Sequence, residues 1–249
     1  MSMDTPNSRE RILGRLRASA PAAANIGAVE ALDARIDTHF TQRRAQAQKS
    51  LAQNVQQFKQ MLEAVHGEVF CASADAWPAE VARRLAAAGV RRLLLDTSSA
   101  EGAALVGALP SAVEALPYAR PIEAWKSELF ETIDAGFTVA RSGLAATGTL
   151  IVVPDANAPR TVSLAPPLHV ALIHARTLHA DLHAAVAAER WRDGMPTNLV
   201  MISGPSKTSD IQQTTAYGAH GPRALWVVVV TDDEADNQAG NPSEAGAAQ

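Results

Sequence analysis

The chain has 249 residues, of which 47% are hydrophobic and 19% are charged, and its net charge is −4. This composition predicts a domain with a full hydrophobic core, and it lacks the basic excess that favours nucleic-acid binding. The longest apolar run, at 224–230, is too short to span a bilayer, and the polar N-terminus has no apolar signal segment. We therefore expect a cytoplasmic protein.

The chain contains one cysteine, Cys71, within the apolar run 67–72. One cysteine cannot form an intrachain disulfide and cannot by itself hold an iron–sulfur cluster. We expect Cys71 to be a buried structural thiol rather than a nucleophile.

Residues 1–66 are predicted to form an N-terminal helical arm. A short helix is expected to end near Ala18, followed by a loose linker over 19–35 and a long helix over 37–65. The long helix carries one apolar stripe, formed by Leu51, Val55, Phe58 and Leu62. Its first half is nearly all polar, so we expect it to project into solvent or to meet a partner.

Short apolar strands alternate with helices over residues 67–231. The expected strands are 67–72, 91–96, 113–118, 135–143, 148–155, 169–175, 198–204 and 225–232. The expected helices are 77–89, 98–109, 122–132 and 178–191. This alternation predicts an α/β fold with a mostly parallel, helix-covered sheet. Residues 232–249 are polar and are predicted to be a disordered tail.

Three stretches rich in Gly, Ser and Thr adjoin apolar strands, at 141–150, 202–211 and 218–226. Ligands of open α/β sheets bind outside the carboxyl ends of the strands. If the three loops lie near one edge of the sheet, they form a single crevice.

The middle loop, "ISGPSKTSDI", has the residue types of an anion site. Gly204 permits close backbone approach, Ser206 and Thr208 offer hydroxyls, and Lys207 offers a positive charge. A helix that begins near Lys207 would direct free N–H groups at an anion. The alternative is an ordinary loop before a helix, in which Asp210 complements the helix dipole. The loop does not match a Walker A motif.

The first loop offers Thr147, Gly148 and Thr149 as ligand-binding residues, although a glycine-containing bend into a strand explains them equally. The third loop offers His220 and Gly221. Because histidine titrates near neutrality, His220 is the best acid–base candidate. The alternative for this loop is a simple turn before the last strand.

Two further features concern histidine and arginine. Arg223 in the third loop adds a second positive charge, and His169 at the start of a strand either lines the same crevice or is a core histidine. His179 and His183 are four residues apart and would share a helix face, but a metal site needs additional ligands. We expect a solvated helix face there and no metal.

In their order and spacing, "GLAATGTLIV", "RTVSLAPPLHVALI", "ISGPSKTSDIQ" and "GAHGPRALWVVVV" resemble the LUD-domain family, and within it the lactate-utilisation C group. The resemblance runs from about Glu68 to Val230. It implies a three-layer α/β/α fold similar to the NagB/RpiA/CoA-transferase-like superfamily, which contains sugar-phosphate isomerases and CoA transferases.

The resemblance also implies a role in oxidising L-lactate to pyruvate, within a set of three proteins of which two carry iron–sulfur segments. With one cysteine here, we expect the clusters in the partner proteins and no cofactor in this chain. A regulatory or assembly subunit, and a separate enzyme acting on a phosphosugar, CoA ester or folate, are the alternatives. The sequence is also compatible with a homo-oligomer.

Two positions depart from the family pattern, because Ala146 and Gln212 stand where glutamate is usual. A covalent role for either position is therefore not expected. What remains is recognition of a small anionic ligand such as lactate, pyruvate or a phosphate-bearing molecule. The expected ligand-binding residues are Thr147, Gly148, Thr149, His169, Gly204, Ser206, Lys207, Thr208, Asp210, Gly221 and Arg223.

Overall fold

The computed structural model describes residues 8–19, 29–47, 49–209 and 215–231. The chain divides into two compact units, Met1–Gln48 and Lys49–Gln249. The tail predicted over 232–249 lies outside the described residues.

The first unit contains α1 (Ser8–Ser19) and α2 (Val29–Ala47), so α2 begins within the stretch predicted as a linker. The single long helix predicted over 37–65 is wrong, because α2 ends and α3 (Leu51–Glu63) begins separately. Ser50 caps α3 in a capping box: its hydroxyl accepts from the Gln53 N–H, and the Gln53 side chain accepts from the Ser50 N–H.

Helix α3 belongs to the second unit, which begins before it rather than at residue 67. The predicted stripe is the reason, since Val55, Phe58 and Leu62 are buried in the core of that unit.

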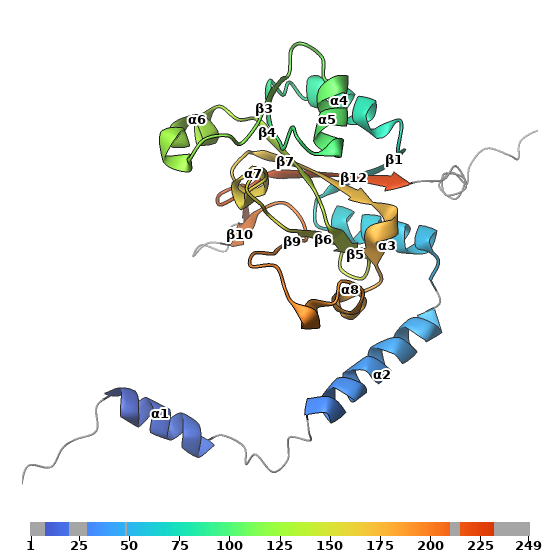
Figure 1. The fold of residues 1–249 in the computed structure, drawn as a ribbon, viewed down its shortest axis with the longest axis vertical. Helices are drawn as coiled ribbons and strands as arrows, with labels where there is room; N and C mark the ends of the chain where they lie inside the picture. The colour runs from blue at the N-terminus through green and yellow to red at the C-terminus, as the bar shows by residue number, and fades with distance from the viewer. Residues whose placement is uncertain (1–7, 20–28, 48, 210–214, 232–249) are drawn as a thin grey trace, which may run out of the picture. The chain divides into compact units, whose positions relative to one another are not determined.

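A six-stranded parallel sheet forms the centre of the second unit, with the order β1-β12-β7-β4-β2-β3 (Figure 1). Its strands are β1 (Glu68–Ser73), β2 (Arg92–Leu94), β3 (Glu114–Leu116), β4 (Ala135–Val139), β7 (Leu168–His174) and β12 (Ala224–Thr231). The central strands β7 and β12 are almost continuously apolar, as expected for strands that are covered on both faces. The α/β class with a parallel sheet is confirmed.

The two faces of this sheet are covered differently (Figure 1). Helices α4 (Trp77–Ala87) and α5 (Ala100–Ala108) pack on one face, around Leu93 and Leu95. Leu94 faces the other side, where it packs with α6 (Lys126–Glu131) and α7 (Arg160–Leu164). Helix α3 and a second sheet complete that side. One outer layer is therefore helical, and the other combines helices with strands.

The second sheet has four strands in the order β8-β5-β6-β9. They are β5 (Ser142–Leu144), β6 (Thr149–Val152), β8 (Leu178–His179) and β9 (Val200–Ile202). The sequence did not predict this sheet as separate, because its strands read as continuations of the main alternation. The predicted strand 135–143 is divided between β4 in one sheet and β5 in the other.

Several local predictions differ from the structure. The predicted helix 178–191 is shorter: β8 comes first, and Asp181 then caps α8 (Leu182–Ala188). His179 therefore lies in a strand and does not share a helix face with His183. Cys71 is exposed rather than buried, because it lies on β1 at the edge of the sheet.

The short helical turns are η2 (Ile122–Ala124), η3 (Ala175–Thr177) and η4 (Trp191–Asp193). The helix predicted to begin near Lys207 is wrong. Instead β10 (Lys207–Ser209) pairs antiparallel with β11 (Thr215–Tyr217). Of the helices that the structure describes, none has both the length and the apolar character needed to cross a bilayer.

Candidate functional site

A cavity of about 320 Å³ lies between α7, β9 and the loops that follow β9 and precede β12. Its lining residues are Ser163, Leu164, His169, Val200, Met201, Ile202, Ser203, Gly204, Pro205, Ser206, Lys207, His220, Gly221, Pro222 and Leu225. The second and third of the predicted loops therefore meet in one site.

The cavity lies at the amino ends of the main-sheet strands, not at their carboxyl ends. His169 is the second residue of β7, and Leu225 is the second residue of β12. The expectation of a carboxyl-edge crevice is wrong because the third loop leads into β12 rather than out of it. The second loop leaves β9, which belongs to the other sheet.

Backbone hydrogen bonds hold the two loops together. The Ser206 N–H donates to the Pro222 carbonyl at 2.8 Å, and the Gly218 N–H donates to the Ser206 carbonyl at 3.0 Å. Gly221 passes so close to Ser206 that an added Cβ would lie 3.1 Å from the Ser206 Cβ. Glycine at position 221 therefore permits the close approach that forms one wall of the cavity.

The charged groups that line the cavity are cationic or neutral. Lys207 and His220 are both exposed and form part of the lining. No aspartate or glutamate is among the lining residues within the described ranges. Arg223 is exposed and follows the lining residue Pro222, but it does not itself line the cavity. This charge pattern favours an anion at the mouth.

His169 lies at the buried side of the cavity, with 1% of its surface exposed. Its Nε2 is 2.8 Å from the Thr138 Oγ1 on β4, which is also buried. Burial lowers the pKa of the His169 imidazole to about 4, so the ring is neutral at pH 7. A neutral ring can donate or accept a hydrogen bond without adding charge.

The first predicted loop contributes to the site through a single contact. The Thr149 Oγ1 is 2.7 Å from both the Thr147 Oγ1 and the Ser203 Oγ, and Ser203 lines the cavity. Gly148 instead packs on α3: its φ is 59°, and an added Cβ would lie 2.7 Å from the Leu62 nitrogen. Gly148 is thus a packing residue in this structure.

The structure brings about half of the predicted site residues together. Those that line the cavity are His169, Gly204, Ser206, Lys207, His220 and Gly221. Those that do not are Thr147, Gly148, Thr149, Thr208 and Arg223. Asp210, together with Gln212, lies outside the described residues.

The sequence-based prediction missed Ser163, Ser203 and Thr138. Ser203 directly follows a strand within a stretch already singled out, and Thr138 is a polar residue inside the apolar run of β4; both signals were readable. Ser163 lies on α7, a helix that was not predicted. Across the portion of the chain that is described, no group of three or more His, Cys, Asp or Glu could hold a metal ion.

Comparison with known proteins places the chain in a family. Residues 55–230 match the LUD domain. Uncharacterized protein NMB1437 of Neisseria meningitidis serogroup B is 40% identical over 174 residues, which cover 69% of this chain and 75% of that protein. A crystal structure of a DUF162 family protein from Deinococcus radiodurans shares the fold, with a TM-score of 0.54 and 24% identity, over 73% of this chain and 99% of that one.

Two relatives carry functional names. Lactate utilization protein C of Shouchella clausii is 34% identical over 108 residues, covering 42% of this chain and 47% of that protein. Lactate utilization protein C of Halalkalibacterium halodurans is 36% identical over 111 residues, covering 41% and 46%. The chain thus matches about half the length of these two relatives. With the LUD domain matched over most of its length, the chain belongs to the LUD domain family.

Proposed function

We propose that this chain is the cluster-free component of an L-lactate-oxidising iron–sulfur protein complex, and that it binds a small anionic ligand in the cavity. The similarity to proteins named lactate utilization protein C supports the biological context. The observation that carries the ligand proposal is the cavity lining, in which Lys207 and His220 stand at the mouth without a lining carboxylate among the residues described.

The proposed recognition is direct. Lys207 supplies the charge that attracts a carboxylate or phosphate, while the hydroxyls of Ser203 and Ser206 supply hydrogen bonds. His220 is the candidate for exchanging a proton with the bound ligand, and the neutral His169 contacts the buried end of the ligand.

We propose that the electron transfer of lactate oxidation takes place in partner proteins. The single cysteine, Cys71, cannot by itself hold an iron–sulfur cluster. Ala146, where relatives in our reading carry glutamate, is exposed and outside the cavity lining, and its N–H donates to the Ala180 carbonyl at 2.9 Å. The proposal therefore assigns ligand binding rather than covalent catalysis to this chain.

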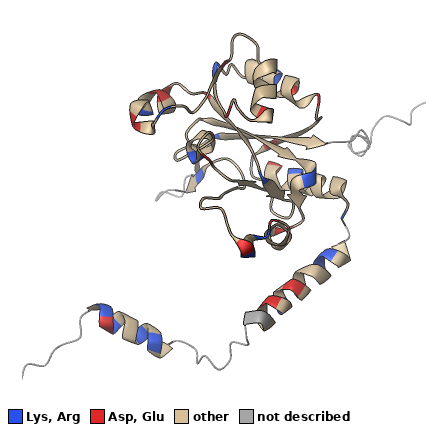
Figure 2. Cartoon of the chain, in the orientation of Figure 1, with Lys and Arg blue, Asp and Glu red and all other residues tan. Residues whose placement is uncertain are grey.

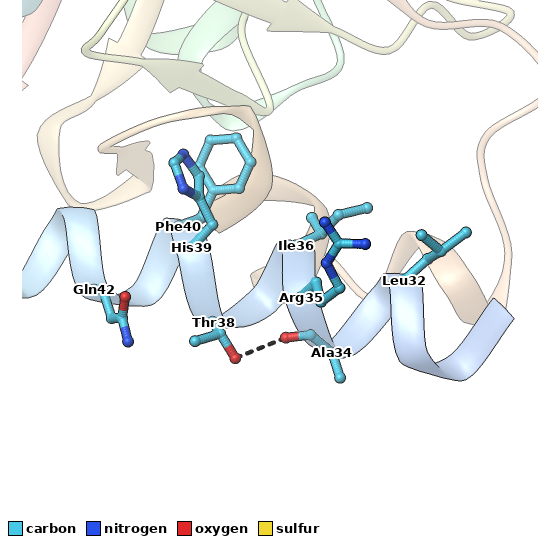
Figure 3. A pocket seen from close by; sticks show the side chains of 8 residues that line it. All are labelled: Leu32, Ala34, Arg35, Ile36, Thr38, His39, Phe40 and Gln42. Carbon is cyan, nitrogen blue, oxygen red and sulfur yellow. Dashed lines mark hydrogen bonds between the residues drawn. The ribbon is translucent and has the colours of Figure 1, made fainter. Parts of the chain in front are cut away.

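A role in assembly is the second candidate, and the first unit favours it. On α2, the side chains of Leu32, Ile36 and Phe40 project from one side of the helix, whereas Thr38 and Gln42 project from the other (Figure 3). Leu32 is 36% exposed and Ile36 is 46% exposed. Exposed apolar side chains in a helical stripe are typical of a protein-binding face.

Helix α1 has a different surface. It buries no residue and contains four arginines and one glutamate (Figure 2). A basic helix of this kind would suit an acidic surface on the iron–sulfur partners.

We also propose a distant relationship to the NagB/RpiA/CoA-transferase-like superfamily with its three-layer α/β/α fold. The six-stranded parallel sheet, covered on both faces, supports this relationship. Within the proposal, the residues of the first loop, Thr147 and Thr149, position Ser203 rather than contact the ligand.

The test measures binding of lactate, pyruvate and inorganic phosphate to the full chain by isothermal titration calorimetry. Replacing Lys207 with alanine should weaken binding about 10- to 100-fold, because a charge-assisted hydrogen bond contributes about 1.5–3 kcal/mol. Lys126→Ala, which removes an exposed lysine from α6 outside the cavity lining, is the matched control. Equal binding by Lys207→Ala and the unmodified chain would contradict the proposed site.

A further inference from the structure

The cavity is large for a three-carbon acid. At about 30 Å³ for each water molecule, its volume of about 320 Å³ corresponds to roughly ten waters. A ligand the size of lactate would displace only about a third of that water. The remaining space would stay hydrated, so the lining residues that face it decide what kind of molecule fills the cavity.

The remaining space is bordered by apolar side chains. Leu164, Val200, Ile202 and Leu225 all line the cavity, and Leu225 is only 2% exposed. Val200 and Ile202 are half-buried and pack against the core cluster between the two sheets. Water held against such a wall is readily displaced by an apolar group, which gains the free energy of burial.

Polar and apolar linings are separated by depth. Lys207 and His220 are exposed and therefore mark the mouth, whereas His169 and Leu225 are buried and mark the inner end. A ligand that fits this gradient carries its charge at one end and an apolar body behind it. Lys207 is the one lysine or arginine among the described lining residues, which suits a single carboxylate better than a doubly charged phosphate.

We propose that the cavity binds a medium-chain monocarboxylate, with the carboxylate at Lys207 and an apolar body of roughly four to six carbons along Val200, Ile202 and Leu225. This inference rests on the proposed function, because it specifies the ligand class of the same anion site. It also implies that lactate alone does not fill the cavity.

The test is a chain-length series on the full chain, using butanoate, hexanoate and octanoate beside lactate in calorimetric titrations at pH 7 and constant ionic strength. Each added methylene should tighten binding about fourfold, from about 0.8 kcal/mol per buried CH₂ and about 1.4 kcal/mol per tenfold change. Hexanoate should therefore bind about 15-fold more tightly than butanoate, and the gain should end once the cavity is full. Hexylamine, with the same body and the opposite charge, should bind much more weakly than hexanoate.

Val200→Phe should occupy the space for the apolar body. We expect it to weaken hexanoate binding at least tenfold and to change lactate binding less than about twofold. Val106→Phe is the matched control, since Val106 is an exposed valine on α5 outside the lining, and it should leave both affinities unchanged. Circular dichroism checks that both variants fold. If Val200→Phe does not fold, the chain-length series on the unmodified chain still decides.

The outcomes separate the two proposals. Equal affinities along the series, with lactate binding that depends on Lys207, would overturn the medium-chain inference and leave the anion site standing. Tighter binding of hexyl phosphate than of hexanoate would overturn the choice of a carboxylate. Absence of binding by every acid, or hexanoate binding that survives Lys207→Ala, would overturn the anion site itself.

Discussion

Replacing His169 with glutamine tests whether a neutral imidazole forms the inner wall of the cavity. Burial lowers the pKa of His169 from 6.5 to about 4, so the unfolded chain binds a proton in this pH window and the folded chain does not. The free energy of unfolding must therefore rise with pH between about 4 and 6.5. At about 1.4 kcal/mol per pH unit, acidification through the window removes about 3 kcal/mol.

The glutamine variant lacks this proton linkage. It should be less stable than the unmodified chain at pH 7, because it disturbs the contact with Thr138, but the difference should shrink by about 3 kcal/mol as the pH falls to 4. Every other titrating group is common to the two proteins, so the change in their difference isolates His169.

Urea unfolding at pH 4, 5, 6 and 7, followed by tryptophan fluorescence, provides the assay. All four tryptophans lie in the second unit, so the signal reports on the unit that contains His169. A stability difference that is the same at pH 4 and pH 7 would refute the buried, neutral imidazole.

Three further variants test the packing around the site by urea denaturation. Glu189→Ala should cost about 3 kcal/mol, because this nearly buried carboxylate accepts hydrogen bonds from an arginine, a tryptophan and a serine, whereas Arg190→Ala, in an exposed ion pair, should cost less than about 1 kcal/mol; equal losses would contradict this ranking. Gly148→Ala should cost more than about 2 kcal/mol, because φ is 59° and the backbone of α3 is in the way, but Gly107→Ala on α5 should be stabilising by about 0.5–1 kcal/mol, and a harmless Gly148→Ala would argue against the packing of this loop on α3. Phe58→Ala should cost about 3–5 kcal/mol, and a loss below 1 kcal/mol would remove α3 from the core of the second unit.

The main sheet could be predicted from local sequence because its strands carry a strong signal. Val227–Val230 form a run of valines that is buried on both faces, which only a covered parallel strand requires. The break between α2 and α3 was also readable, since Ser50 and Gln53 have the spacing of a capping box. The stripe on α3 dominated the prediction and extended the helix backwards through this cap.

The structure after β9 could not be predicted from local sequence. A short run of Ser, Thr and Lys suits both the first turn of a helix and an exposed strand. The strand is selected by antiparallel pairing of Lys207 with Tyr217, ten residues away, and a local pattern does not contain that pairing. The same is true of β8, whose two residues pair with β5 across a long separation in sequence.

The edge on which the cavity lies decides how an anion can be held there. Ligands at carboxyl edges commonly use the N-terminus of the helix that follows a strand, where free N–H groups and the helix dipole favour negative charge. Here α7 reaches the lining only with Ser163 and Leu164, near its carboxyl end, and the predicted helix at Lys207 is a strand. No helix N-terminus therefore faces the cavity among the described elements. The affinity for an anion must come from side chains, chiefly Lys207, and this is why removing one amine should have a large effect.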